Sequence, residues 1–303
     1  MRGFRFMDVE YRDGEEYKAS KSNINQIVDN VTNEVIKSFS GVGNTRKIRV
    51  MNNVIAFVGA AGGVGTSTIL ANVAHKVSKK GLSVLVIDAN ILYPIQHTFF
   101  GVKEELEAKD LISFLMGANQ IGDSIKGVTS NLSLMFANNR YLTDSINCDN
   151  QVCAENFTDT IDRIKHLFDL ILIDCPMDVG HHIYNSILYN CDIIYSVWDE
   201  GLSCISNIDR FRKNLQMCGI ESTYKLRVIF NKKTKVHYTK YIFDQLDVDL
   251  IGTLPFDIAI IESSLAGEIF IDKGSSLSKT ATAFANEIGN ITDKILEIGG
   301  YKE

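Results

Sequence analysis

The sequence predicts an α/β fold, with a doubly wound, mainly parallel sheet and helices on both faces. Short apolar runs alternate with amphipathic stretches from Val54 onward, a pattern typical of βαβ units. The runs are continuously apolar, as strands covered on both faces require. The chain has 303 residues, 45% of them hydrophobic, which is enough to bury a large core without disulfide bonds or a structural metal.

The expected elements follow one another in a regular order. We expect strands at residues 54–60, 83–88, 132–137, 169–176, 191–198, 225–232 and 250–255. We expect helices at residues 66–80, 155–167 and 204–218. The final segment, 290–303, has an apolar stripe and a mixed polar face, which indicates a helix that closes the domain rather than a membrane anchor.

Residues 1–50 differ from the rest of the chain. They are polar and hold one helical pattern, from Lys18 to Phe39, followed by a glycine-containing break. We therefore predict an N-terminal helical extension and linker at residues 1–50, and a single α/β domain at residues 51–303. The extension is expected either to pack on the domain or to bind a partner.

Composition narrows the class of protein. The net charge is −6, so any nucleic-acid binding needs a local basic patch. No apolar stretch reaches the ~18 residues that a membrane span needs, and the N-terminus lacks the apolar core of a secretory signal. None of the six cysteines forms a CxxC pair, which favours free thiols in a reducing compartment. We expect a cytoplasmic protein with no integral membrane segment.

A glycine-rich turn is the strongest local feature. The strand VIAFVG runs into Gly62, Gly63 and Gly65, and a helix is expected to begin at Thr66. Glycines let backbone amides close around an anion, and a helix N-terminus favours negative charge, so phosphate is the expected guest. Two phosphate sites fit: a dinucleotide fingerprint with Asp88 on the ribose, or a P-loop with Ser67 on magnesium. The turn alone does not decide between them.

A second motif lies downstream. Residues 168–176 read FDLILIDCP, an apolar strand that ends in Asp174. A carboxylate at a strand tip, beside a phosphate loop, is the Walker-B arrangement, in which it supports magnesium through water or through the Ser67 hydroxyl. The alternative is an aspartate that only caps the strand end.

Together these segments resemble the ParA/MinD family of P-loop ATPases, whose loop reads KGGVGKTT. Residues 61–68, AGGVGTST, match that loop, and LVIDAN at 85–90 resembles the family's LLIDxD segment. VIFNK at 228–232 resembles the strand whose asparagine reads adenine, and LPFD at 254–257 resembles the family's IPxD. The resemblance covers roughly residues 51–290 in the right order and implies a P-loop NTPase fold that binds ATP or ADP with Mg²⁺.

The resemblance also implies a set of site residues. For nucleotide binding it implies Gly62, Gly63, Val64, Gly65, Thr66, Ser67, Thr68, Asn231 and Pro255. For the metal it implies Ser67 and Asp174. For catalysis it implies Asp88 and Asn90.

Three departures from the family pattern bear on activity. The signature lysine position holds Ala61, the loop lysine position holds Thr66, and the second acid of the LLIDxD segment is Asn90. Loss of one donor to a transition state typically raises a barrier by on the order of 3–4 kcal/mol. We therefore expect impaired or absent hydrolysis, so that the chain is at most a weak ATPase.

Three functions remain open at this point. The first is a dimeric positioning or partitioning switch for DNA or for a pilus-type surface machine, at the nucleoid or a cell pole, with an unknown cargo or activator protein. Degenerate loops occur in the TadZ/CpaE-like branch, which usually carries a receiver-like domain where residues 1–50 lie here. The second is a nucleotide-independent pseudo-ATPase scaffold. The third is an NAD-dependent oxidoreductase.

The segment 225–240 holds basic residues and no acid. In an acidic protein this is a local patch, interpreted either as a non-specific DNA contact or as a solvated surface. Its basic residues are Lys225, Arg227, Lys232, Lys233, Lys235 and Lys240.

Overall fold

The computed structural model describes residues 52–103, 109–138, 147–148, 150–176, 180–217, 219, 225–234, 249–272 and 278–301. The predicted extension at residues 1–50 lies outside them and stays a prediction. Every described residue belongs to one compact unit, Ile48–Glu303.

An eight-stranded sheet forms the centre of this unit, in the order β3-β4-β2-β5-β1-β6-β7-β8. Neighbouring strands pair in parallel except β3 and β4, which are antiparallel. The strands are β1 Val54–Gly59, β2 Val84–Asp88, β3 Lys126–Thr129, β4 Leu132–Phe136, β5 Leu170–Asp174, β6 Ile193–Trp198, β7 Leu226–Lys233 and β8 Asp249–Pro255. This confirms the predicted doubly wound, mainly parallel α/β fold.

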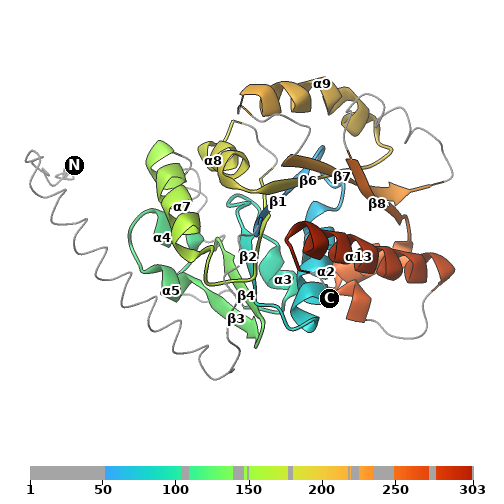
Figure 1. Cartoon of the computed structure of the whole chain (residues 1–303), viewed down its shortest axis with the longest axis horizontal. Helices are drawn as coiled ribbons and strands as arrows, with labels where there is room; N and C mark the ends of the chain where they lie inside the picture. The colour runs from blue at the N-terminus through green and yellow to red at the C-terminus, as the bar shows by residue number, and fades with distance from the viewer. Residues whose placement is uncertain are drawn as a thin grey trace, which may run out of the picture. The chain divides into compact units, whose positions relative to one another are not determined.

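Helices cover both faces of the sheet (Figure 1). The helices α7, α8 and α9 lie on one face, and α2, α3 and α13 lie on the other. Their bounds are α2 Thr66–Lys79, α3 Gln96–Phe99, α4 Leu111–Leu115, α5 Ile121–Ser124, α7 Gln151–Ile164, α8 His182–Asn190, α9 Leu202–Met217, α12 Ile258–Leu265 and α13 Lys279–Ile298, with the 3₁₀ turn η1 at Phe270–Asp272.

The core explains why the strand sequences are uniformly apolar. Every residue of β2, β4, β5 and β6 is buried, because helices pack on both sides of these strands. Trp198 is the largest fully buried side chain, and its indole donates to Ser196 Oγ at 2.8 Å. The five described cysteines are all buried, and none of them forms a disulfide bond with another.

Helix α13 closes the domain over the last strand. Ile291 and Ile295 are fully buried, so the apolar stripe of this helix faces the protein. An added Cβ at Gly252 of β8 would lie 2.5 Å from the Ile291 side chain, so only glycine allows this close packing. Among the described residues, no helix is both long and apolar enough to cross a membrane.

Several elements differ from the expectation. Helix α13 begins at Lys279, before the predicted residue 290, and five of the described helices were not predicted: α3, α4, α5, α8 and α12. Helix α7 begins at Gln151, before the predicted residue 155, because the side chain of Asn150 caps it by accepting from the Cys153 amide at 2.9 Å. Strand β3 was not predicted, since it is short and half-exposed and lacks a continuous apolar run.

Candidate functional site

The carboxyl ends of the parallel strands bring the predicted site residues to one edge of the sheet. Asp88 and Asp174 are register partners at the ends of β2 and β5, and Asp174 is also opposite Phe57 of β1. Asn231 and Pro255 lie near the ends of β7 and β8. The strand order reverses at β1, between β5 and β6, and ligands of such sheets bind at this point.

The glycine-rich loop between β1 and α2 has the geometry of an anion cradle. Gly63 and Gly65 have φ of 74° and 96°, a region that glycine enters without strain. Helix α2 has no side-chain cap and no acid in its first turn. Within the described part of the chain, the backbone amides of residues 62–68 donate to no acceptor. These free donors fit a phosphate group.

Asn231 holds the loop from the side of β7. It is buried, and its Nδ2 donates to the carbonyl of Val64 at 2.7 Å. A Cβ added at Gly65 would lie 2.4 Å from the same nitrogen. The structure thus brings Asn231 to the loop, while Pro255 is paired across the sheet with Lys233.

A network of buried polar side chains lies under the loop. Asp174 accepts from Gln96 Nε2 at 2.7 Å and also hydrogen-bonds to the Ser67 side chain. The same Gln96 nitrogen donates to the Ser67 carbonyl at 3.1 Å. Burial raises the pKa of Asp174, although its hydrogen bonds to Gln96 and Ser67 oppose the shift. Ser67 and Asp174 therefore lie together, and a hydroxyl beside a carboxylate is a donor set that fits Mg²⁺.

Asp88 is fully buried beside Asp174. Its carboxylate accepts from three backbone amides: that of Asn90 at 3.2 Å, that of Ile95 at 2.7 Å and that of Gln96 at 2.8 Å. Burial, and then the charge of Asp174, raise the pKa of Asp88. In this structure Asp88 orders the segment that follows β2, and its catalytic role stays a prediction.

The structure also places Ala61 and Thr66, the two residues that stand at the lysine positions of the family's loop. Ala61 is buried, and Thr66 packs its hydroxyl close to Gly59, where an added Cβ would lie 2.8 Å from it. The Thr68 hydroxyl lies 3.2 Å from Ser264 Oγ of α12, which links the loop helix to the C-terminal part of the chain.

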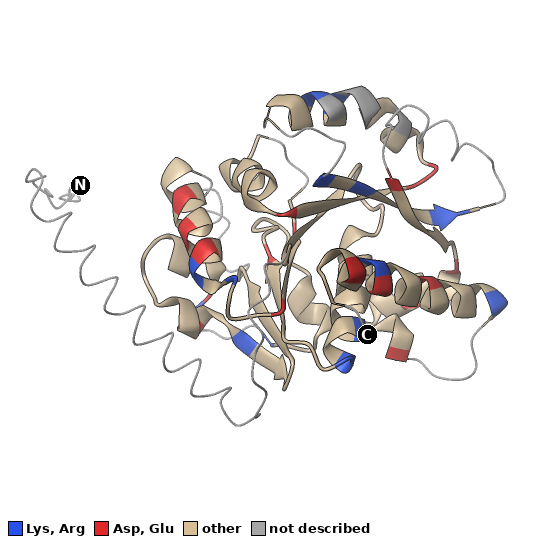
Figure 2. Cartoon of the chain, in the orientation of Figure 1, with Lys and Arg blue, Asp and Glu red and all other residues tan. Residues whose placement is uncertain are grey.

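The predicted basic patch is divided among different contacts. Lys225 donates to the carbonyls of Leu188 and Tyr189, and Arg227 lies 3.4 Å from Asp249. Basic residues colour parts of strand β7 in Figure 2; the strand holds Arg227, Lys232 and the exposed Lys233, and Lys225 directly precedes it. Lys235 and Lys240 lie outside the described residues.

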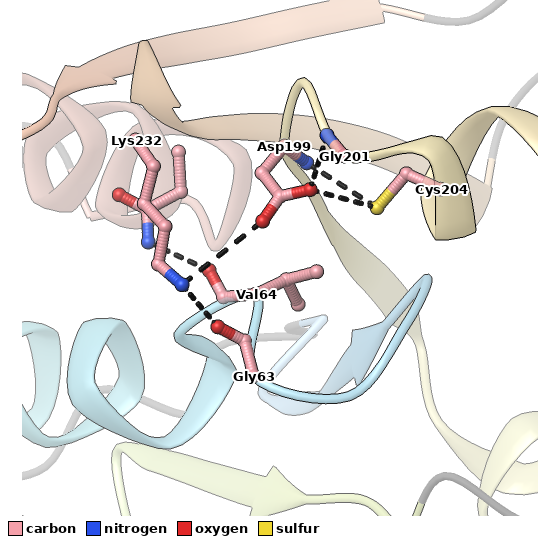
Figure 3. Close-up of polar contacts among 7 residues, drawn as sticks. Gly63, Val64, Asp199, Gly201, Cys204 and Lys232 are labelled. Atoms are coloured by element: carbon pink, nitrogen blue, oxygen red, sulfur yellow. Dashed lines mark hydrogen bonds and ion pairs between the residues drawn. The ribbon is translucent and has the colours of Figure 1, made fainter. Parts of the chain in front are cut away.

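Three residues at the site could not be, or were not, assigned to it from the sequence. Gln96 has no motif to mark it. Asp199 directly follows β6, so the rule that parallel strands gather their functional residues at their carboxyl ends could have identified it. Lys232 was assigned to the basic patch, but its ammonium donates to the carbonyl of Gly63 in the loop (Figure 3).

Comparisons with known proteins agree with this geometry. The family model described as "AAA domain" matches residues 52–225, more than half of the chain. The septum site-determining protein MinD of Synechocystis is 27% identical over 245 residues, covering 78% of this chain and 88% of that protein.

Two solved structures share the fold. The MinD of Pyrococcus horikoshii in complex with Mg-ADP has a TM-score of 0.69 and 21% identity, covering 83% of this chain and 98% of that one. A ParA family ATPase from Chlorobium tepidum has a TM-score of 0.66 and 19% identity, covering 81% of this chain and 99% of that one. By its matching family model, its relatives and its fold, this chain belongs to the ParA/MinD family of P-loop ATPases.

Proposed function

We propose that this protein is a nucleotide-dependent positioning switch that binds ATP or ADP with Mg²⁺ and hydrolyses ATP slowly or not at all. The observation that carries the proposal is the loop itself. Its amides from 62 to 68 are free to bind phosphate, while the positions of both family lysines are neutral, at Ala61 and Thr66.

Each part of the site has a separate task in this proposal. The loop amides and the N-terminus of α2 bind the phosphates, and Asn231 and Pro255 border the space expected for the base. Ser67 and Asp174 would hold Mg²⁺, which neutralises phosphate charge when it is bound. The MinD of Pyrococcus horikoshii, a relative of the same fold, was solved with Mg-ADP, which supports this assignment.

Slow hydrolysis follows from the side chains that are missing. Phosphoryl transfer depends on cations that stabilise the negative charge of the transition state and on a group that orients the attacking water. Thr66 can donate one hydrogen bond but carries no charge, and Asn90 has an amide where the family has a carboxylate. The chain can thus retain a nucleotide without turning it over.

Titration calorimetry of the full chain with MgATP and MgADP, beside a phosphate-release assay, tests the proposal. We expect saturable binding of both nucleotides and little phosphate release. Turnover at about 1 s⁻¹ or faster, an ordinary enzymatic rate, would contradict the predicted loss of hydrolysis. A thermal-shift panel that responds to NAD or NADP but not to ATP or ADP would instead support the oxidoreductase.

If no nucleotide binds, the result would support the second alternative, a nucleotide-independent pseudo-ATPase scaffold. The fold would then act only as a docking surface, independent of ligand. The cargo in either case is DNA or a surface machine, with a second copy of the chain as the proposed partner. A DNA contact would depend on Lys233, which is exposed, and on Lys235 and Lys240, because Lys225, Arg227 and Lys232 contact the chain itself.

A further inference from the structure

A lysine from outside the loop reaches the phosphate cradle. The Nζ atom of Lys232 donates to the carbonyl of Gly63 and lies 4.0 Å from Asp199 Oδ2 (Figure 3). Gly63 is exposed at the centre of the loop, between the positions of the two missing lysines. A positive charge is therefore present at the loop although Ala61 and Thr66 carry none.

The backbone of β7 is distorted where it presents this lysine. Lys232 has a φ of 55°, the one positive value among the described residues that are not glycine. The register of β7 with β8 shifts between Phe230 and Lys233, which marks a bulge at this point. Such a conformation is unfavourable for a lysine and persists only where its surroundings enforce it. The result is that Asn231 and Lys232, adjacent in sequence, contact the adjacent carbonyls of Val64 and Gly63.

Asp199 is held firmly at the end of β6. Its Oδ1 accepts from the Gly201 amide at 2.9 Å and from Cys204 Sγ at 3.2 Å, which orients Oδ2 toward the lysine. A Cβ at Gly201 would lie 2.8 Å from Oδ1, so a side chain at this position would displace the carboxylate. The side chains of Lys232 and Asp199 are 35% and 19% exposed, and an ion pair 4.0 Å apart in partial contact with solvent is weak. A phosphate group could therefore compete with this carboxylate for the lysine.

We propose that Lys232 is the cation of the nucleotide site, kept at the loop by Asp199 until the phosphates of a nucleoside di- or triphosphate take its charge. This inference rests on the proposed function, that the loop binds a nucleotide. It assigns to a residue of β7 the electrostatic contribution to binding that loop lysines make in the rest of the family. It concerns affinity for the ligand and leaves hydrolysis impaired.

The affinities of three variants for MgADP and MgATP, measured by calorimetry at one salt concentration, test the proposal. We expect Lys232→Met to weaken binding about tenfold or more, as loss of a charged hydrogen-bond donor does, and Lys232→Arg to retain most of the affinity. Lys233→Met is the matched control, because its exposed side chain is one residue further along the same strand. We expect it to bind as the wild type does.

Asp199→Asn separates an electrostatic role from a structural one. If Lys232 serves the ligand, removal of the competing carboxylate should tighten nucleotide binding. If the pair only braces the loop, Asp199→Asn and Lys232→Met should weaken binding alike, and that result would overturn the proposal. Thermal unfolding of each variant checks that it is folded.

Failure of the proposed function gives a different result. A wild-type chain that binds neither MgADP nor MgATP removes the function and this inference together. A wild-type chain that binds both, with an unchanged affinity in Lys232→Met, overturns the assignment of Lys232 alone.

Discussion

The carboxyl pair Asp88 and Asp174 should make the proposed magnesium binding depend on pH. Burial raises the pKa of Asp174 from 3.8 to about 6, and only the ionised form binds a cation well. Affinity for Mg²⁺ should therefore fall as the pH decreases through this range. We expect Mg²⁺ to add more to the thermal shift by ADP at pH 8 than at pH 5, measured against ADP with a chelator.

The raised pKa values of these two acids also make the stability of the metal-free protein depend on pH. Because the folded-state pKa values of both acids are raised, the folded protein binds more protons than the unfolded chain between about pH 4 and the raised values. This contribution to stability is complete at low pH and is lost as the pH rises.

Asp174→Asn is the control for the thermal-shift experiment with Mg²⁺ and ADP. The nucleotide phosphate still titrates in this variant, but the pH dependence of the Mg²⁺ effect that comes from Asp174 should be abolished. An equal Mg²⁺ effect at both pH values in the wild type would refute the role of this carboxylate.

At the scale of elements, the loop between β1 and α2 requires glycine far more at position 65 than at position 63. Gly65 has a φ of 96°, and a Cβ there would lie 2.4 Å from Asn231 Nδ2. We expect Gly65→Ala to lower the free energy of unfolding by roughly 1–3 kcal/mol and to abolish nucleotide binding, because the displaced asparagine releases the Val64 carbonyl. Urea unfolding and calorimetry measure the two effects.

Gly63→Ala is the matched comparison for this loop. Gly63 has a φ of 74°, but nothing lies within 4 Å of the added Cβ. Its cost should be limited to backbone strain, about 1 kcal/mol. If both variants lose the same stability, then the contact with Asn231 is not what fixes the loop.

The elements also show what a sequence can reveal. The buried strands and the helix after the loop were predictable because their apolar runs and their glycines are local signals, visible without a partner. Strand β3 was missed because it is half-exposed, and a pairing with β4 defines it. At the site, Asp88, Asp174 and Asn231 were predictable from strand ends that match a family. Gln96 and the place of Lys232 were not, because both depend on contacts between segments far apart in the chain.

At the scale of the whole molecule, α13 connects the edge of the sheet to the proposed nucleotide site. It packs on β8 through Ile291 and also contacts α2, the helix that begins at the glycine-rich loop. The fold of the site therefore depends on a helix near the end of the chain. A change in this helix should alter global stability without touching any residue proposed to bind the ligand.

Ile291→Ala tests this dependence. The side chain is fully buried, and its truncation leaves a cavity between α13 and β8, which should lower the free energy of unfolding by about 2–4 kcal/mol. Gly289→Ala on the same helix should instead raise it by about 0.5–1 kcal/mol, because its Cβ meets nothing within 4 Å and alanine favours the helix. Urea midpoints of the two variants should thus move in opposite directions. If α13 were a membrane-binding helix loosely attached to the domain, Ile291→Ala would leave the midpoint unchanged and would reduce sedimentation with anionic liposomes.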